Sequence, residues 1–231
     1  MDRSTRFVAG FLIAAILTPA SGFAARIKDW NPTIHPADFT NSTSITNTYF
    51  PLPVGRTWHY EGQTRDGLET LDITVTSQTR TVMGITTRVV TETHRLNGQI
   101  VEVSQNYFAQ DNQGTVWYFG EFSQEYDNGV PGSTAGSWEA GVSGALPGII
   151  MEATPQPGDQ YFQEFAEGVA EDQAQVMSTT DTATVPYNSY SGVLRTKEWT
   201  DLEPSSREKK YYAPNVGLII DSELRLVSIT G

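Results

Sequence analysis

The chain has 231 residues, with 27 acidic against 15 basic side chains and a formal net charge of −12. This negative charge argues against binding to nucleic acid or to an anionic membrane surface, because both require a positive field. The sequence contains no cysteine, which excludes disulfides, thiolate metal sites and lipid modification of a cysteine, so the fold depends on its core.

The first 24 residues are predicted to be a signal peptide. Arg3 and Arg6 precede the apolar run 7–17, and the small residues 22–24 fit a cleavage site before Ala25. The apolar run is well short of the roughly 20 residues that a membrane-spanning helix needs. We therefore expect an exported protein, periplasmic or extracellular, without membrane insertion.

Residues 25–48 are polar and contain Pro32 and Pro36, which predicts an extended arm outside the core. Regular structure is expected from Tyr49 onward. There a Pro-Val-Gly turn leads into a strand with Trp58 and Tyr60 on one face.

The next stretches alternate apolar and polar residues and are rich in β-branched and aromatic side chains, which is typical of strands. They cover residues 68–79, 85–96, 99–110 and 115–126. Asn97-Gly98 between two of them is a strong hairpin signal. The pattern predicts an all-β fold, mainly antiparallel, in the form of a curled sheet or open barrel.

Two segments, about 49–126 and 155–229, share landmarks in the same order, which predicts two duplicated β units. Trp58 falls opposite Tyr161, and Tyr107 opposite Tyr211, at offsets that differ by one residue. Each unit is short for a core of its own, so we expect a single β domain over residues 49–231. Two small independent domains are the alternative.

A glycine-rich segment, about 127–154, joins the two units and includes the run GSWEAGVSGALPGIIM. Its glycines and Pro147 predict a loop without regular structure. Its apolar side chains predict that the loop packs against the sheet. Our hypothesis is a lid over an aromatic cavity, with Trp138 and Leu146 facing inward, and a plug in the core is the alternative.

No catalytic motif is present, so an enzyme is the less favoured interpretation. Carboxylates cluster in two stretches, and oxygen ligands of this kind suit Ca²⁺, but neither stretch has the spacing of a calcium loop. Glu121 and Glu164 would be the pair for a carboxylate-based hydrolase, the third hypothesis. The weak metal candidates are Glu121, Glu125, Asp127, Glu164, Glu171 and Asp172.

The aromatic residues favour a different function. The strand around Trp117 is apolar on both faces, so it needs cover on both sides or lines a cavity on one of them. The leading hypothesis is a non-enzymatic protein that binds or carries an apolar or aromatic small molecule. An exported structural or surface protein that binds calcium or another cation is the alternative. The expected ligand-binding residues are Trp58, Tyr60, Trp117, Phe119, Trp138, Leu146 and Tyr211.

Four motifs carry a resemblance to known proteins: YFPLPVGRTWHYEG, VWYFGE, GSWEAGVSGALPGIIM and YYAPNVGLI. They resemble a family of exported bacterial β-rich proteins over residues 49–222. The last motif is also similar to the YAPGVGLV strand pair of lipoprotein-carrier-like open barrels, with Asn215 in place of the usual glycine. The resemblance implies an exported β domain and brings no assigned activity.

Overall fold

The computed structural model describes residues 30–231, and the predicted signal peptide lies outside these residues. A single turn of 3-10 helix, η1 (Pro36–Asp38), precedes the strands. In chain order the strands are β1 (Thr57–Gln63), β2 (Leu68–Val82), β3 (Ile85–Leu96), β4 (Gln99–Gln110), β5 (Val116–Asp127), β6 (Val130–Pro131), β7 (Trp138–Glu139), β8 (Leu146–Met151), β9 (Gln160–Phe162), β10 (Glu164–Phe165), β11 (Asp172–Thr184), β12 (Ser189–Thr200), β13 (Glu208–Ala213), β14 (Gly217–Asp221) and β15 (Leu224–Thr230).

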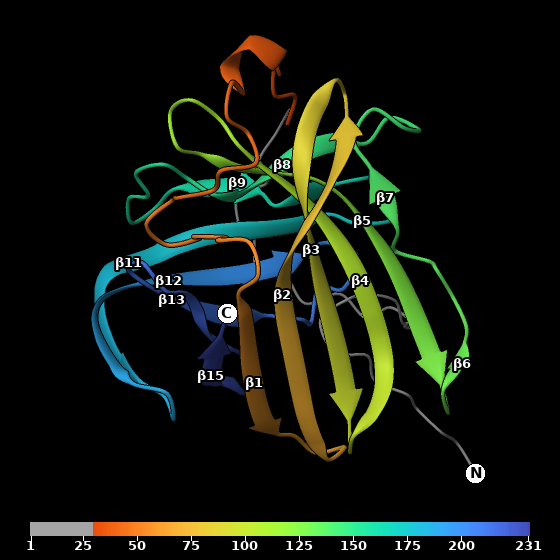
Figure 1. Ribbon diagram of the computed structural model, residues 1–231, viewed down its shortest axis with the longest axis vertical. Coiled ribbons are helices and arrows are strands. Elements are labelled where there is room, and N and C mark those ends of the chain that lie inside the picture. Colours follow the sequence, from red (N-terminus) through yellow and green to blue (C-terminus); the bar gives the residue numbers. More distant parts are fainter. Residues whose placement is uncertain (1–29) are drawn as a thin grey trace.

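The strands form one antiparallel sheet that curls into a nearly closed barrel (Figure 1). Thirteen of the strands described follow one path, β10-β8-β5-β4-β3-β2-β1-β15-β14-β13-β12-β11-β9. In Figure 1, β2, β3 and β4 run steeply through the view, whereas β11 and β12 cross it. The predicted all-β, antiparallel fold is confirmed.

The hairpin predicted at Asn97-Gly98 is present between β3 and β4. Both residues have positive φ, 51° and 80°, as a two-residue turn of this kind requires. Leu96 pairs with Gln99 directly beside the turn. The local turn signal therefore fixes the pairing beside the turn, and a β-bulge between His94 and Arg95 then shifts the register.

The barrel closes through one short piece of chain that contains β9 and β10. β9 pairs with β11, and β10 pairs with β8, so consecutive residues contact the two ends of the sheet. At the change of partner, the Gln163 N–H donates to Asp172 O at 2.7 Å. The opposite strand carries Gly148, where a Cβ would lie only 2.0 Å from Gln163 O. Glycine is thus required for this close approach.

The arm packs against the barrel, which corrects the expectation that it lies outside the core. Phe39 and Ile45 are buried within the main core cluster, and Phe39 meets the Phe119 ring edge-on at 5.7 Å. Buried Asn47 donates from Nδ2 to Gly114 O and to Glu152 O, both at 2.9 Å. These contacts, together with backbone hydrogen bonds such as Gln110 N–H to Ser42 O at 2.8 Å, dock a segment of polar composition.

The glycine-rich segment 127–154 contains three strands, so the prediction that it lacks regular structure is wrong. β7 and β8 both pair with β5, and β8 also pairs with β10. Partners on both sides supply backbone hydrogen bonds, which local propensity does not reveal. The segment is therefore part of the barrel wall.

The two halves of the barrel follow the same plan. β1 to β5 with β8 form one meander of neighbouring strands, and β9 with β11 to β15 form another. The Gly55 N–H donates to Val75 O, and the Gly158 N–H donates to Val176 O, each at 2.8 Å. These matching contacts support the repeat predicted from the sequence, and the duplication itself stays a prediction.

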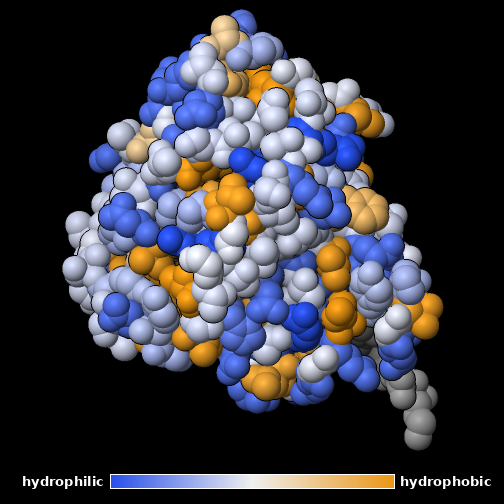
Figure 2. Space-filling model, in the orientation of Figure 1, coloured by the Kyte–Doolittle hydropathy of each residue, from blue (hydrophilic) through white to orange (hydrophobic). Residues whose placement is uncertain are grey.

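The outer surface is mixed in character. Figure 2 shows apolar atoms in several separate groups among hydrophilic ones on this face. Large exposed apolar side chains are scattered, with Val130 the most exposed of them at 65%. Single residues of this kind are normal on a protein surface and do not indicate a binding patch. Among residues 30–231 there is no helix with the length and apolar character to cross a membrane.

Candidate functional site: a cavity inside the barrel

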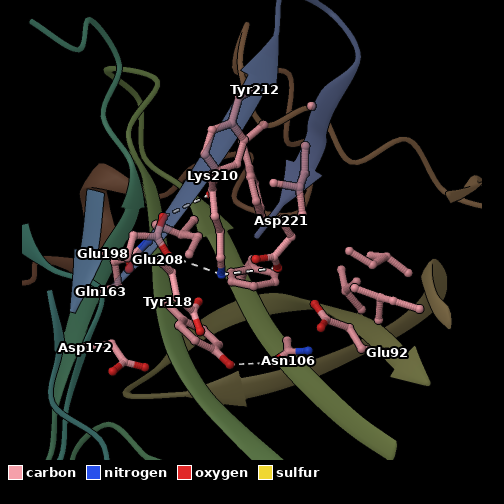
Figure 3. A pocket seen from close by; sticks show the side chains of 18 of the residues that line it. Glu92, Asn106, Tyr118, Gln163, Asp172, Glu198, Glu208, Lys210, Tyr212 and Asp221 are labelled. Carbon is pink, nitrogen blue, oxygen red and sulfur yellow. Dashed lines mark hydrogen bonds and ion pairs between the residues drawn. The ribbon is translucent and has the colours of Figure 1, made fainter. Parts of the chain in front are cut away.

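The barrel contains a cavity of about 170 Å³ that opens to the outside and is lined by strands from both halves. Figure 3 shows charged and polar side chains from several strands around it. Inward-facing positions alternate along each strand, so the cavity wall is set by the register of the sheet. A dry cavity of about 150 Å³ can hold benzene, so this volume suits a small organic molecule.

The first half provides most of the apolar wall. Trp58 Nε1 donates to Val216 O at 3.0 Å, and Tyr60 OH donates to Leu218 O at 2.8 Å. These bonds hold both rings in place across the junction with the second half. The main apolar lining residues of the first half are Trp58, Tyr60, Leu71, Ile73, Phe108 and Tyr118.

The rest of the wall is strongly acidic. Two of the lining carboxylates belong to the first half and five belong to the second. Among the described residues that line the cavity, Lys210 is the one basic side chain. The seven are Glu92, Glu121, Glu164, Asp172, Glu198, Glu208 and Asp221.

Lys210 lies between two of these carboxylates (Figure 3). Its Nζ is 3.2 Å from Glu198 Oε2 and 3.6 Å from Asp221 Oδ2. Thr196 donates to the other Glu198 oxygen at 2.7 Å, and Tyr212 OH lies 3.4 Å from it. Burial alone lowers the pKa of Lys210, but Asp221 and Glu198 outweigh burial and hold that pKa well above its ordinary value. The lysine is a fixed cation and not a nucleophilic amine.

Asn106 projects into the cavity from β4, in the first half. Tyr118 OH donates to Asn106 Oδ1, and Asn106 Nδ2 donates to Ser104 Oγ at 3.0 Å. Across the strand pair, Asn106 lies opposite Glu121. The amide is therefore held by neutral partners and brings no charge to the two acidic residues of this half.

Several of the cavity carboxyls hold their protons to unusually high pH. Burial raises the pKa of Glu121 and of Asp172 to about 8, and neighbouring carboxylates push both in the same direction. Burial also raises the pKa of Glu208 to about 7 and that of Glu164 well above its usual range. The cavity therefore exchanges protons near neutral pH, and a bound cation would favour the ionised carboxylates.

The structure brings Trp58 and Tyr60 of the predicted ligand-binding residues to the cavity. Trp117 and Phe119 lie on the opposite face of β5 from Tyr118, which does line it. Trp117 Nε1 donates to Asp111 Oδ2 at 2.9 Å. A strand that is apolar on both faces does not reveal which face meets the cavity.

The remaining three predicted residues lie outside the cavity wall. Trp138 is buried behind the wall with its ring 5.3 Å from the Tyr118 ring, and Leu146 is half-buried opposite Phe165. Tyr211 is half-buried beside Tyr212, which faces inward. Whether the segment acts as a lid remains a hypothesis.

Three of the predicted metal candidates, Glu121, Glu164 and Asp172, line the cavity. Glu125, Asp127 and Glu171 lie elsewhere. Within residues 30–231, no three or more Asp, Glu or His side chains are arranged to hold a metal ion.

Sequence reasoning missed Glu92, Glu198, Glu208, Lys210 and Asp221. One signal was available, because the aligned motifs NYFAQ and KYYAP place Lys210 opposite Asn106. Comparisons with family models, with curated proteins and with solved structures give no match, so the site is interpreted from its own geometry.

Proposed function

We propose that this protein binds and carries a small molecule inside its barrel, without catalysing a reaction. The observation that carries this proposal is the cavity of about 170 Å³ with aromatic and aliphatic side chains along one wall. Pockets that bind small molecules combine such an apolar lining with a few converging polar groups. With the predicted signal peptide, we place this function outside the cytoplasm.

The apolar wall supports an apolar or aromatic part in the ligand. Trp58 and Tyr60 line this wall and are both anchored by hydrogen bonds, so the wall is preorganised for an apolar group. Ile73 is half-buried and belongs to the same wall. A ligand there would remove this apolar surface from water.

Binding of N-phenyl-1-naphthylamine, a neutral probe that fluoresces in apolar surroundings, tests the proposal. Ile73→Phe puts a larger side chain into the cavity, so we expect at least about fivefold weaker probe binding. Leu68→Phe is the matched control, because Leu68 is an exposed residue of the same strand and should leave binding unchanged. Equal binding by both variants and the parent protein would contradict binding inside the barrel.

Native mass spectrometry of protein purified from its own host complements this test. We expect a co-purifying small molecule in the parent protein and less of it in Ile73→Phe. A molecule retained equally by both proteins would lie outside the cavity.

A further inference from the structure

Strand pairing places Asn106 and Lys210 at equivalent positions in the two halves. Asn106 on β4 pairs with Val90 on β3, and Lys210 on β13 pairs with Thr196 on β12. Each then lies opposite an acidic residue on the next strand, Glu121 for Asn106 and Asp221 for Lys210. A β-bulge follows both positions, next to Phe108 and Tyr212 respectively.

Each half has a second carboxylate near this position, and these two residues, Glu92 and Glu198, are also equivalent in the strand pairing. Glu92 is paired with Ile73 on the preceding strand, and Glu198 is paired with Ala174. The second half thus has Glu198 and Asp221 with an ammonium group between them. The first half has carboxylates at both matching positions, Glu92 and Glu121, but a neutral amide where the second half has the lysine.

The two first-half carboxylates differ in their neighbours, because Glu92 has a histidine beside it, whereas the groups that act on Glu121 are a serine and other carboxyls. His94 Nε2 is 3.8 Å from Glu92 Oε2, and a Ser104 hydrogen bond reaches Glu121. Acidic Glu102 and Asp172 also face Glu121.

A second observation concerns Asp221, which is only 7% exposed and lines the same cavity. Its Oδ1 has no hydrogen-bond partner among the described residues. A buried carboxylate oxygen of this kind is costly unless a donor reaches it. The charge of Glu92 acts on Asp221, so this oxygen favours a ligand donor or positive charge in the part of the cavity that Glu92 also reaches.

We propose that the ligand is an organic cation whose ammonium group lies between Glu92 and Glu121, as Lys210 Nζ lies between Glu198 and Asp221. This inference rests on the proposed function and deepens it by naming the ligand class. The apolar body of the cation packs against the aromatic wall, which Tyr60 and Tyr118 help to line.

Two probes of the same shape test the inference. Phenyltrimethylammonium and tert-butylbenzene differ in one atom, because a charged nitrogen replaces a carbon. Each is titrated against protein loaded with N-phenyl-1-naphthylamine at pH 8, and displacement gives the two affinities. We expect the cation to bind about tenfold more tightly than the hydrocarbon.

Variants at Asn106 and Glu121 test where the charged group of the probe binds. Asn106→Lys gives the first half the internal cation of the second, so the preference for the charged probe should fall to about onefold. Asn106→Met introduces a side chain about as long as that of lysine but without a charge. This variant should still prefer phenyltrimethylammonium to tert-butylbenzene. Glu121→Gln is a nearly isosteric second variant that should also reduce the preference, should Asn106→Lys fail to fold.

The outcomes separate this inference from the proposed function. Equal binding of the two probes to the parent protein would overturn the cation inference and leave the proposed function standing. A preference retained in both Asn106→Lys and Glu121→Gln would overturn the assigned position. Displacement by neither probe would also overturn the cation inference, whereas the proposed function fails only if N-phenyl-1-naphthylamine does not bind or binds Ile73→Phe as tightly as the parent protein.

Discussion

The two halves of the barrel share a strand plan but differ in what they present to the cavity. At equivalent positions, the first half has Leu71 where the second has Asp172, and Asn106 where the second has Lys210. The first half contributes most of the apolar wall, and the second contributes five of the seven carboxylates. Backbone pairing leaves inward side chains free to vary, so one plan yields two chemically different walls.

The largest expected effect comes from removing the cation of the second half. Lys210→Met leaves Glu198 and Asp221 without their partner, so we expect a loss of about 3 kcal/mol in the free energy of unfolding at pH 8. The loss should shrink at lower pH, because burial raises the pKa of Asp221 and lets this carboxyl take up a proton more readily. Urea unfolding at pH 8 and at pH 5 measures it.

The matched control is Asn106→Met at the equivalent position in the first half. It removes an amide held by neutral partners, so its cost should be smaller, about 1–2 kcal/mol, and nearly independent of pH. Equal costs for the two variants would show that the halves do not differ electrostatically.

The acidic wall predicts that the protein is more stable at pH 5 than at pH 8. The pKa values of Glu121 and Asp172 are about 8 in the folded state, and unfolded carboxyls titrate near pH 4. Between these values the folded state holds more protons, so raising the pH removes stability. The pKa of His94 is also raised, because Glu92 outweighs the lowering effect of burial, and this acts in the same direction.

We expect a loss of at least about 2 kcal/mol between pH 5 and pH 8, or roughly 4–8 °C in melting temperature. Thermal melts across this range, in buffers of constant ionic strength, measure it. Glu121→Gln should flatten the curve. A melting temperature that rises toward pH 8 would contradict the raised pKa values.

The smallest expected effect concerns the bond that links the two walls. Tyr60→Phe removes the hydroxyl that donates to Leu218 O, so we expect a loss of about 1 kcal/mol. Tyr49→Phe is the control, because its hydroxyl makes a longer bond, 3.2 Å, to Gly192 O from a half-buried position. Urea unfolding compares the two, and a larger loss for Tyr49→Phe would contradict the ranking.

The sequence allows the fold to be predicted because strand alternation and turn residues are local signals. Asn97-Gly98 and the alternation around Trp58 both lead to correct elements. The residues of the site are harder to predict from the sequence, because they depend on which inward positions face one another across the barrel. Trp117 and Tyr118 are adjacent aromatics, and only the closed sheet decides that Tyr118 faces the cavity.

The acidic residues of the cavity were also hard to predict from the sequence. In a chain of charge −12, a single Glu or Asp is usually solvated, so Glu92 and Glu198 give no local signal. Pairing across the sheet brings them to one cavity. The predicted loop failed for a related reason, because β8 gains its partners from distant segments.

The closing segment has a consequence for association between chains. A free strand edge is a template on which another chain can add a strand, and natural β proteins conceal such edges. Here β9 and β10, joined at Gln163, cover the edges of β11 and β8 with one run of backbone. Each half alone would leave both of its outer strands uncovered, so the union of the halves protects the sheet from intermolecular strand addition as well as forming the cavity.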